Sequence, residues 1–164
     1  MNKMLYLYTS FNGRLNRQPF WLASIGLFLL ALVLSVVVIL PLASISALLG
    51  KAVNFVLSVA ILYPVCALGV KRLKDRNKPL WLMAVFIAPS LLFQVLDLLG
   101  LATQSVSIQG QAIAAPTLLG SAIGLIGLIV GIWGLITLGF KKGTTGPNPY
   151  GPDPLATIHT ENNA

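Results

Sequence analysis

Charged side chains are scarce in this chain of 164 residues: 11 are Lys or Arg and four are Asp or Glu, 9% in total. Soluble domains carry about 25% charged residues, and a folded monomer this poor in charge cannot cover its surface with polar groups. Disordered chains are rich in charge and poor in apolar residues, whereas 56% of this chain is hydrophobic. We therefore expect an integral membrane protein rather than a soluble enzyme or a disordered chain.

Cysteine and histidine are almost absent. The single cysteine, Cys66, lies in an apolar run, where a small packing residue is the expected role. The single histidine, His159, has no cysteine or second histidine at ligand spacing, so we expect no metal site. The sequence also lacks a nucleophile elbow, a phosphate-binding loop and paired carboxylates within an apolar run. These absences predict a protein that is not an enzyme and holds no cofactor.

Uncharged stretches define the candidate membrane spans, because a helix needs about 20 apolar residues to cross about 30 Å of hydrocarbon. The predicted fold class is an all-α integral membrane protein, a compact four-transmembrane-helix bundle. The expected division of the chain is an N-terminal segment (1–19), a membrane domain (20–140) and a tail (141–164). Within the membrane domain we expect spans at about 20–40, 52–70, 80–99 and 117–140, with a basic loop at 71–79.

The basic residues predict the orientation of these spans. Ten of the 11 lie in the N-terminal segment, the 71–79 loop or the tail, and only Lys51 lies on the other side. Lys and Arg concentrate in cytoplasmic loops. Both termini and the 71–79 loop are therefore predicted to face the cytoplasm. The net charge of +7 then serves orientation and contact with anionic headgroups, and we expect no nucleic-acid binding.

Glycines recur in the last span at spacings of 4, 3, 4 and 3, which places them on one helix face. Such a face allows close approach of a neighbouring helix. Packing within the chain, homodimerisation and the lining of a substrate path all remain open for this helix-packing stripe, which consists of Gly120, Gly124, Gly127, Gly131 and Gly134.

Three other residues stand out within the spans. Pro64 and Pro89 each remove a backbone hydrogen bond and bend their helix. Two interpretations are open for these kinks: together they open a small cavity, or they have a structural role alone. Asp97 is the only acid in or near a span. It is interpreted as a solvated interfacial carboxylate, as a proton or ion site, or as a structural partner, for example of Lys51.

Three motifs mark the expected cytoplasmic side. The first contains Gly13, Arg14, Arg17, Phe20 and Trp21, and the second contains Lys71, Arg72, Leu73, Asp75 and Trp81. The third contains Asn148, Tyr150, Gly151, Asp153 and Pro154. In order and spacing they are similar to the motifs of the bacterial inner-membrane family called domain of unknown function 805, over almost the whole chain. Lys74 stands where that family has a histidine. The resemblance implies a four-span inner-membrane protein with no established activity.

The motifs contain a candidate cluster of charged residues, which we call the rim cluster: Arg14, Arg17, Arg72, Asp75 and Asp153. One hypothesis is that the three arginines gather around the two acids and lock the tail and the 71–79 loop beneath the helices. Two alternatives are a simple topology signal and specific binding of phosphate headgroups, which suits the guanidinium group. Trp21 and Trp81 are expected to act as interfacial anchors.

Two function classes follow from the sequence. The first is a non-catalytic membrane module that packs with partners or anionic lipids through its basic rim, as a homodimer or with another membrane protein. The alternative is a small transporter or channel component that acts as an oligomer, with Asp97, Gln94 and the proline kinks near a path. The sparse polarity within the spans favours the first class, because a transport path requires a continuous polar track.

Overall fold

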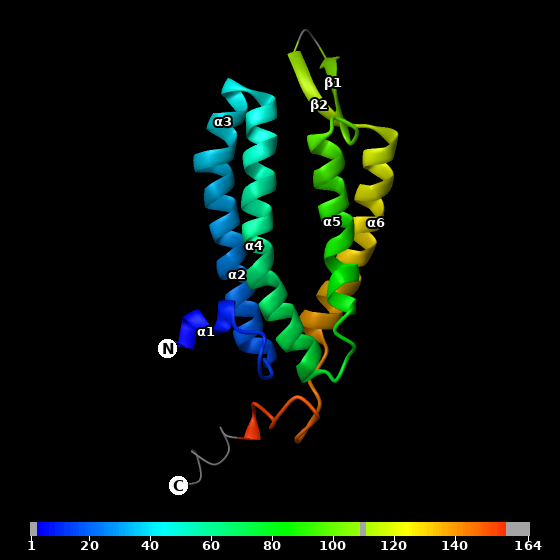
Figure 1. Ribbon diagram of the computed structural model, residues 1–164. Coiled ribbons are helices and arrows are strands. Elements are labelled where there is room, and N and C mark those ends of the chain that lie inside the picture. Colours follow the sequence, from blue (N-terminus) through cyan, green and yellow to red (C-terminus); the bar gives the residue numbers. More distant parts are fainter. Residues whose placement is uncertain (1–2, 109–110, 157–164) are drawn as a thin grey trace.

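The computed structural model describes residues 3–108 and 111–156, and the described part of the chain is mostly helical. Two short segments are π-helical, and two strands form a hairpin (Figure 1). In chain order the elements are α1 (Lys3–Thr9), α2 (Arg17–Leu34), η1 (Ser35–Ile39), α3 (Leu40–Ile45), α4 (Ala47–Asp75), α5 (Leu82–Leu98), β1 (Thr103–Ile108), β2 (Gln111–Pro116), α6 (Leu118–Leu135) and η2 (Ile136–Phe140).

Three helical stretches are long and apolar enough to cross a membrane: Arg17–Ile45, Ala47–Asp75 and Leu118–Phe140. The first two contain the spans predicted at about 20–40 and 52–70, and the third matches the span predicted at about 117–140 except for Thr117, which caps it. The helix in the place of the predicted span 80–99 is α5, which is apolar but has only 17 residues.

The first of these stretches does not end near residue 40 as expected. The π-helical turn η1 leads directly into α3, and Pro41 occupies the first turn of α3. A helix tolerates proline in its first turn because the missing N–H has no partner to lose there. The stretch therefore continues to Ile45.

The predicted loop at 71–79 is also shorter than expected. The helix α4 continues through Asp75, with Pro64 inside it, and the N–H of Arg76 closes its last turn on Arg72 O. Asn77 follows with a positive φ of 50°, a conformation that asparagine adopts more readily than most residues. Only residues 76–81 connect α4 to α5, because tertiary contacts described below hold the basic end of α4.

The polar segment that the sequence places before the last span forms an antiparallel hairpin. The strand β1 pairs with β2 in a register that matches Thr103 with Pro116 and Val106 with Ile113. Thr117 follows β2 and caps α6, since its Oγ1 accepts a hydrogen bond of 3.0 Å from Gly120 N. Short polar runs carry a weak strand signal, so the sequence did not predict this hairpin.

The long helices run side by side, α2 beside α4 and α5 beside α6 (Figure 1). The β-hairpin lies at one end, which we call the hairpin end. The helix α1, the turn between α4 and α5 and the segment that follows η2 lie at the opposite end, which we call the terminal end.

The buried core lies toward the terminal end, where the N-terminal segment, α2, α4, α5 and η2 converge. It consists of Leu15, Phe20, Ala23, Leu68, Leu73, Leu82, Met83 and Leu138. Outside it, large apolar side chains cover the helix surfaces; Phe28 is 66% exposed and Leu118 is 90% exposed. Exposed apolar surface on this scale suits contact with lipid rather than water.

Candidate functional site

The rim cluster contains a buried ion pair network centred on Asp75, at the last residue of α4. Arg14 Nε lies 3.1 Å from Asp75 Oδ1, and Arg72 Nη1 donates to Asp75 Oδ2. The side chains of Arg14, Arg72 and Asp75 are only 1%, 0% and 5% exposed. Two guanidinium groups therefore share one carboxylate, out of contact with solvent.

The remaining guanidinium N–H groups of Arg72 bind backbone carbonyls. Nε donates to Leu138 O at 2.7 Å, Nη1 to Leu15 O at 3.2 Å and Nη2 to Lys141 O at 2.5 Å. The carbonyls at the end of a helix have no partner within the helix. Arg72 thus satisfies the end of η2 and also joins it to the N-terminal segment.

Arg14 binds the tail in a similar way. Its Nη1 donates to Gly146 O at 2.7 Å and to Gly151 O at 3.2 Å, and its Nη2 donates to Thr144 O at 2.5 Å. A charged group buried without partners is costly, but these two arginines find both a carboxylate and carbonyl oxygens. We call the three side chains of Arg14, Arg72 and Asp75, with the backbone groups that they bind, the buried clamp.

The tail packs directly against α4 at Asp75. Thr144 N donates to Asp75 O at 2.8 Å, and Thr144 Oγ1 donates to the same oxygen at 3.0 Å. A Cβ on Gly143 would overlap the Asp75 carboxylate. Glycine is therefore required at residue 143 if the tail is to approach the clamp this closely.

The other two members of the rim cluster, Arg17 and Asp153, do not join the ion pairs, although both border the same cavity as Asp75. Arg17 is the first residue of α2, its side chain is exposed, and its Nη1 lies 3.4 Å from Phe140 O. Asp153 forms a local turn instead: its carboxylate accepts N–H bonds from Gly146 at 2.9 Å and Leu155 at 3.0 Å. These backbone bonds lower the pKa of Asp153.

Three further basic residues at the end of α4 face inward, which sequence reasoning missed. Lys71 Nζ donates to Leu7 O at 2.5 Å, Lys74 Nζ to Phe11 O at 2.7 Å, and Arg76 Nη1 to Thr137 O at 2.6 Å. Lys71 is only 2% exposed. No local pattern marks these contacts, because each joins residues more than 60 positions apart in the chain.

Four other cations at the terminal end face outward. All four are exposed, and within residues 3–108 and 111–156 none lies within salt-bridge distance of a carboxylate. We call them the free cations: Arg17, Lys78, Lys141 and Lys142. The basic residues of this end are thus divided into a buried structural set and an exposed set that is available to anions.

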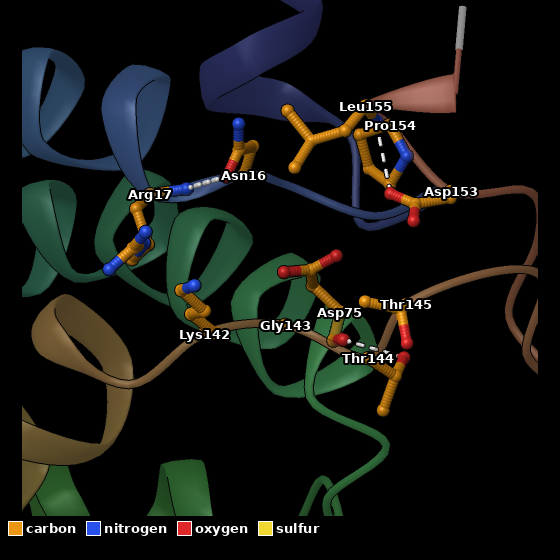
Figure 2. A pocket seen from close by; sticks show the side chains of 10 residues that line it. All are labelled: Asn16, Arg17, Asp75, Lys142, Gly143, Thr144, Thr145, Asp153, Pro154 and Leu155. Carbon is orange, nitrogen blue, oxygen red and sulfur yellow. Dashed lines mark hydrogen bonds between the residues drawn. The ribbon is translucent and has the colours of Figure 1, made fainter.

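Two cavities lie beside two of the free cations, Arg17 and Lys142. The first, of about 230 Å³, is bordered by Asp75, Lys142 and Asp153 among others (Figure 2). The second is a groove of about 470 Å³, and its lining includes polar residues as well as Trp21 and Phe140. Arg17 borders both. These cavities place cations next to apolar surface, as expected where a protein meets lipid headgroups.

The two expected anchor tryptophans occupy different environments. Trp21 is partly buried against η2: its Nε1 donates to Gly139 O at 3.1 Å, and its ring lies edge-on to Phe140 with centroids 5.4 Å apart. Trp81 stands 64% exposed just before α5. Trp81 therefore has the exposure of an interfacial anchor, whereas Trp21 also fastens α2 to η2.

Only part of the helix-packing stripe contacts the rest of the chain. A Cβ on Gly120 would overlap the carbonyl oxygen of Ala102, and one on Gly134 would lie 3.3 Å from the Phe86 ring. A Cβ on Gly127 would lie 3.5 Å from Pro89. The other two stripe glycines, Gly124 and Gly131, would meet nothing within 4 Å. The contacting glycines are seven residues apart, so the face that packs on α5 is narrower than the stripe.

Asp97 pairs with Lys51 at the hairpin end. Lys51 Nζ lies 2.8 Å from Asp97 Oδ1 and 2.8 Å from Thr103 Oγ1, and Thr103 Oγ1 also donates to Asp97. The two charged side chains are 30% and 22% exposed. Of the readings open for Asp97, the structure shows the structural pairing, which joins the start of α4 to the end of α5 and to β1.

No group of three or more His, Cys, Asp or Glu side chains that could hold a metal ion occurs in the described part of the chain. His159 lies outside the described residues. The described site consists of the buried charge pairs and the exposed cations.

The fold and this end define a mostly helical protein with three candidate membrane-spanning helices and a charged clamp at the end of its apolar helices. Residues 8–152 match a family described as "Protein of unknown function (DUF805)". The chain belongs to this family, as its three motifs indicated. No curated protein and no solved structure matches it.

Proposed function

We propose that the chain is a four-span protein of the bacterial inner membrane, with both termini in the cytoplasm, and that it is a non-catalytic module which binds anionic lipid headgroups. The observation that carries the proposal is the division of the basic residues at the terminal end. Arg14 and Arg72 are already paired within the buried clamp, whereas the four free cations are exposed next to apolar helix surface.

The span count rests on α5 as the fourth membrane helix. Its 17 residues measure about 26 Å at 1.5 Å per residue, a few ångströms less than a typical hydrocarbon core. Local thinning of the bilayer and exposed flanking residues accommodate such a mismatch at modest cost. An even number of spans would place both termini on one side, and the excess of Lys and Arg at that end supports a cytoplasmic location for it.

The pairing of Asp97 weighs against the transporter alternative. A transport path needs polar groups that are free to bind a substrate or proton, but Lys51 and Thr103 already engage the Asp97 carboxylate. Its partners also tie the hairpin to α4 and α5, which is a structural role. A headgroup-binding function therefore explains more of the observed side-chain contacts than a transport function does.

Orientation is tested by cysteine labelling in intact cells. In a Cys66→Ser background, Ser107→Cys places one thiol on the hairpin, and Thr145→Cys places one in the tail. An impermeant maleimide is expected to label Ser107→Cys in intact cells and Thr145→Cys only after the membrane is broken. The opposite pattern would overturn the orientation.

Headgroup binding is tested by reconstituting the full chain in vesicles of mixed phosphatidylglycerol and phosphatidylcholine and measuring the retained lipids by native mass spectrometry. Replacing the four free cations with glutamine is expected to lower the preference for phosphatidylglycerol more than about tenfold, since each basic residue near an anionic surface contributes about 1 kcal/mol. The matched control exchanges Lys for Arg and Arg for Lys at the same positions and should keep the preference. An unchanged preference in the glutamine variant would overturn the proposal.

A further inference from the structure

An apolar cavity of about 320 Å³ lies between the α2–α4 pair and the ends of α5 and η2. Ser24 is the one polar side chain among the described residues of its lining. The other walls come from all four elements, through residues such as Phe28, Val65, Leu68, Met83 and Leu138.

The size and opening of this cavity suit a hydrocarbon chain. An apolar cavity of about 150 Å³ is dry and takes up benzene, and this one is about twice as large. Phe28 lines it yet is 66% exposed, so the cavity opens at the outer surface of α2. A helix with its side chains is about 10 Å across and is too wide for this space, so a single flexible chain is the occupant that fits.

The cavity and the groove that Arg17 borders are separate spaces, but they follow one another along one face of α2. Arg17, Trp21, Ser24 and Phe28 follow one another at spacings of 4, 3 and 4, which places them on one stripe of the helix. Arg17 and Trp21 border the groove described above, whereas Ser24 and Phe28 border the apolar cavity.

The facing element shows the same succession. On η2, Leu138 lines the apolar cavity, and the next two residues, Gly139 and Phe140, line the groove. The two spaces therefore follow each other along one seam between α2 and η2. From Arg17 to Phe28 the seam is about 16 Å long at 1.5 Å per residue.

We propose that this seam binds one phospholipid, with the anionic phosphate at Arg17 and one acyl chain in the apolar cavity. The inference deepens the proposed function and rests on it, because it assigns one of the free cations to a defined lipid site. Arg17 suits this role through its charge and its planar guanidinium. Its exposed side chain makes one long hydrogen bond, to Phe140 O, and no salt bridge to the described carboxylates.

The test uses native mass spectrometry of the full chain released from vesicles of equal phosphatidylglycerol and phosphatidylcholine. The wild type is expected to retain one phosphatidylglycerol per chain. Ala31→Phe fills the apolar cavity from α2 and is expected to abolish retention. Ala60→Phe, its matched control on the exposed surface of α4, should retain the lipid.

The headgroup end is tested by Arg17→Gln, which is expected to weaken retention about fivefold, as the loss of one basic residue at an anionic surface predicts. Lys78→Gln removes an exposed cation that borders neither the groove nor the cavity, so it should weaken retention of this one lipid clearly less than Arg17→Gln does. Thermal unfolding of each variant in detergent checks that a lost lipid does not reflect a lost fold.

Two results would overturn the inference. Retention that survives Ala31→Phe shows that the cavity holds no acyl chain. Equal losses in Arg17→Gln and Lys78→Gln show a diffuse charge effect, which leaves the proposed function standing without a defined site. The proposed function fails separately, when the variant without any free cation keeps the wild-type preference for phosphatidylglycerol.

Discussion

The two ends of the molecule each hold an acid paired with a base, but in different surroundings. At the terminal end, Asp75 is 5% exposed and two arginines share it. At the hairpin end, Asp97 is 22% exposed and pairs with Lys51, which is 30% exposed. The first pair network is almost completely buried, and the second is partly exposed to solvent.

This difference determines what each pair contributes. A partly exposed ion pair contributes about 0–1 kcal/mol because water competes for its charges. Removing one partner of a buried pair leaves an uncompensated charge and costs about 3–5 kcal/mol. The clamp at the terminal end is therefore a structural requirement, while the Lys51–Asp97 pair mainly sets the local position of the hairpin.

Substitution of Asp75 tests this difference between the two ends most directly and should have the largest effect. Asp75→Asn leaves Arg14 and Arg72 buried without a counter-charge, so we expect the free energy of unfolding to fall by about 3–5 kcal/mol. SDS titration of the protein in mixed micelles, followed by circular dichroism, measures the loss. Asp97→Asn is the matched control and should lose about 1 kcal/mol or less; equal losses would contradict the distinction between the ends.

The next effect is steric. Gly143→Ala pushes a Cβ into the Asp75 carboxylate, and overpacking of this kind costs about 1–3 kcal/mol. Limited proteolysis should then cleave the tail faster than in the wild type. The matched control is Thr145→Ala, which should leave cleavage unchanged because residue 145 does not have a positive φ. Gly146→Ala is unsuitable as a control, since Gly146 has a positive φ of 75° that alanine rarely adopts.

Glycine substitutions in α6 compare two positions of one helix face. Gly120→Ala would drive a Cβ into the carbonyl of Ala102, so we expect a loss of about 1–3 kcal/mol. Gly124→Ala meets nothing within 4 Å and should be neutral or slightly stabilising, since alanine favours the helix. Thermal unfolding in detergent measures both. A destabilising Gly124→Ala would point to a contact with a second chain on that face.

The smallest expected effect is the pH response of the tail. The N–H groups of Leu155 and Gly146 lower the pKa of Asp153 below the usual aspartate value of 3.8. A lowered folded-state pKa stabilises the tail turn above the unfolded value and loses that contribution as the pH falls through the folded value. Tail cleavage by an acid-tolerant protease should therefore rise below pH 3.8. Asp153→Asn should remove this rise.

Sequence reasoning located the apolar helices and the family well, because both depend on patterns within the chain. The spans predicted at about 20–40 and 52–70 lie within two of the candidate membrane-spanning helices, and the span predicted at about 117–140 matches the third to within one residue. The motif match is confirmed by the family. Sequence reasoning missed two features: the helix continues past Pro41, and α4 is helical as far as Asp75. Both depend on how neighbouring turns accommodate backbone groups that lack a hydrogen-bond partner within the helix.

The candidate site was predictable in its residue types but not in its geometry. Asp75 stood out as an acid among basic residues, and the structure brings it together with Arg14 and Arg72. Nothing in the sequence separates Arg14 from Arg17, which lie three residues apart. The distinction depends on the position of Arg17 in the first turn of α2 and on the tail carbonyls that reach only Arg14.

The backbone bonds of Arg72 have a consequence for the order in which the protein is made. Its partners Leu138 and Lys141 are translated well after Arg72 itself, since a chain emerges from its N-terminus onward. Until these residues have been synthesised, Arg72 lacks two of its backbone acceptors. The clamp therefore reaches its complete form only after the last apolar helix and the start of the tail have been made.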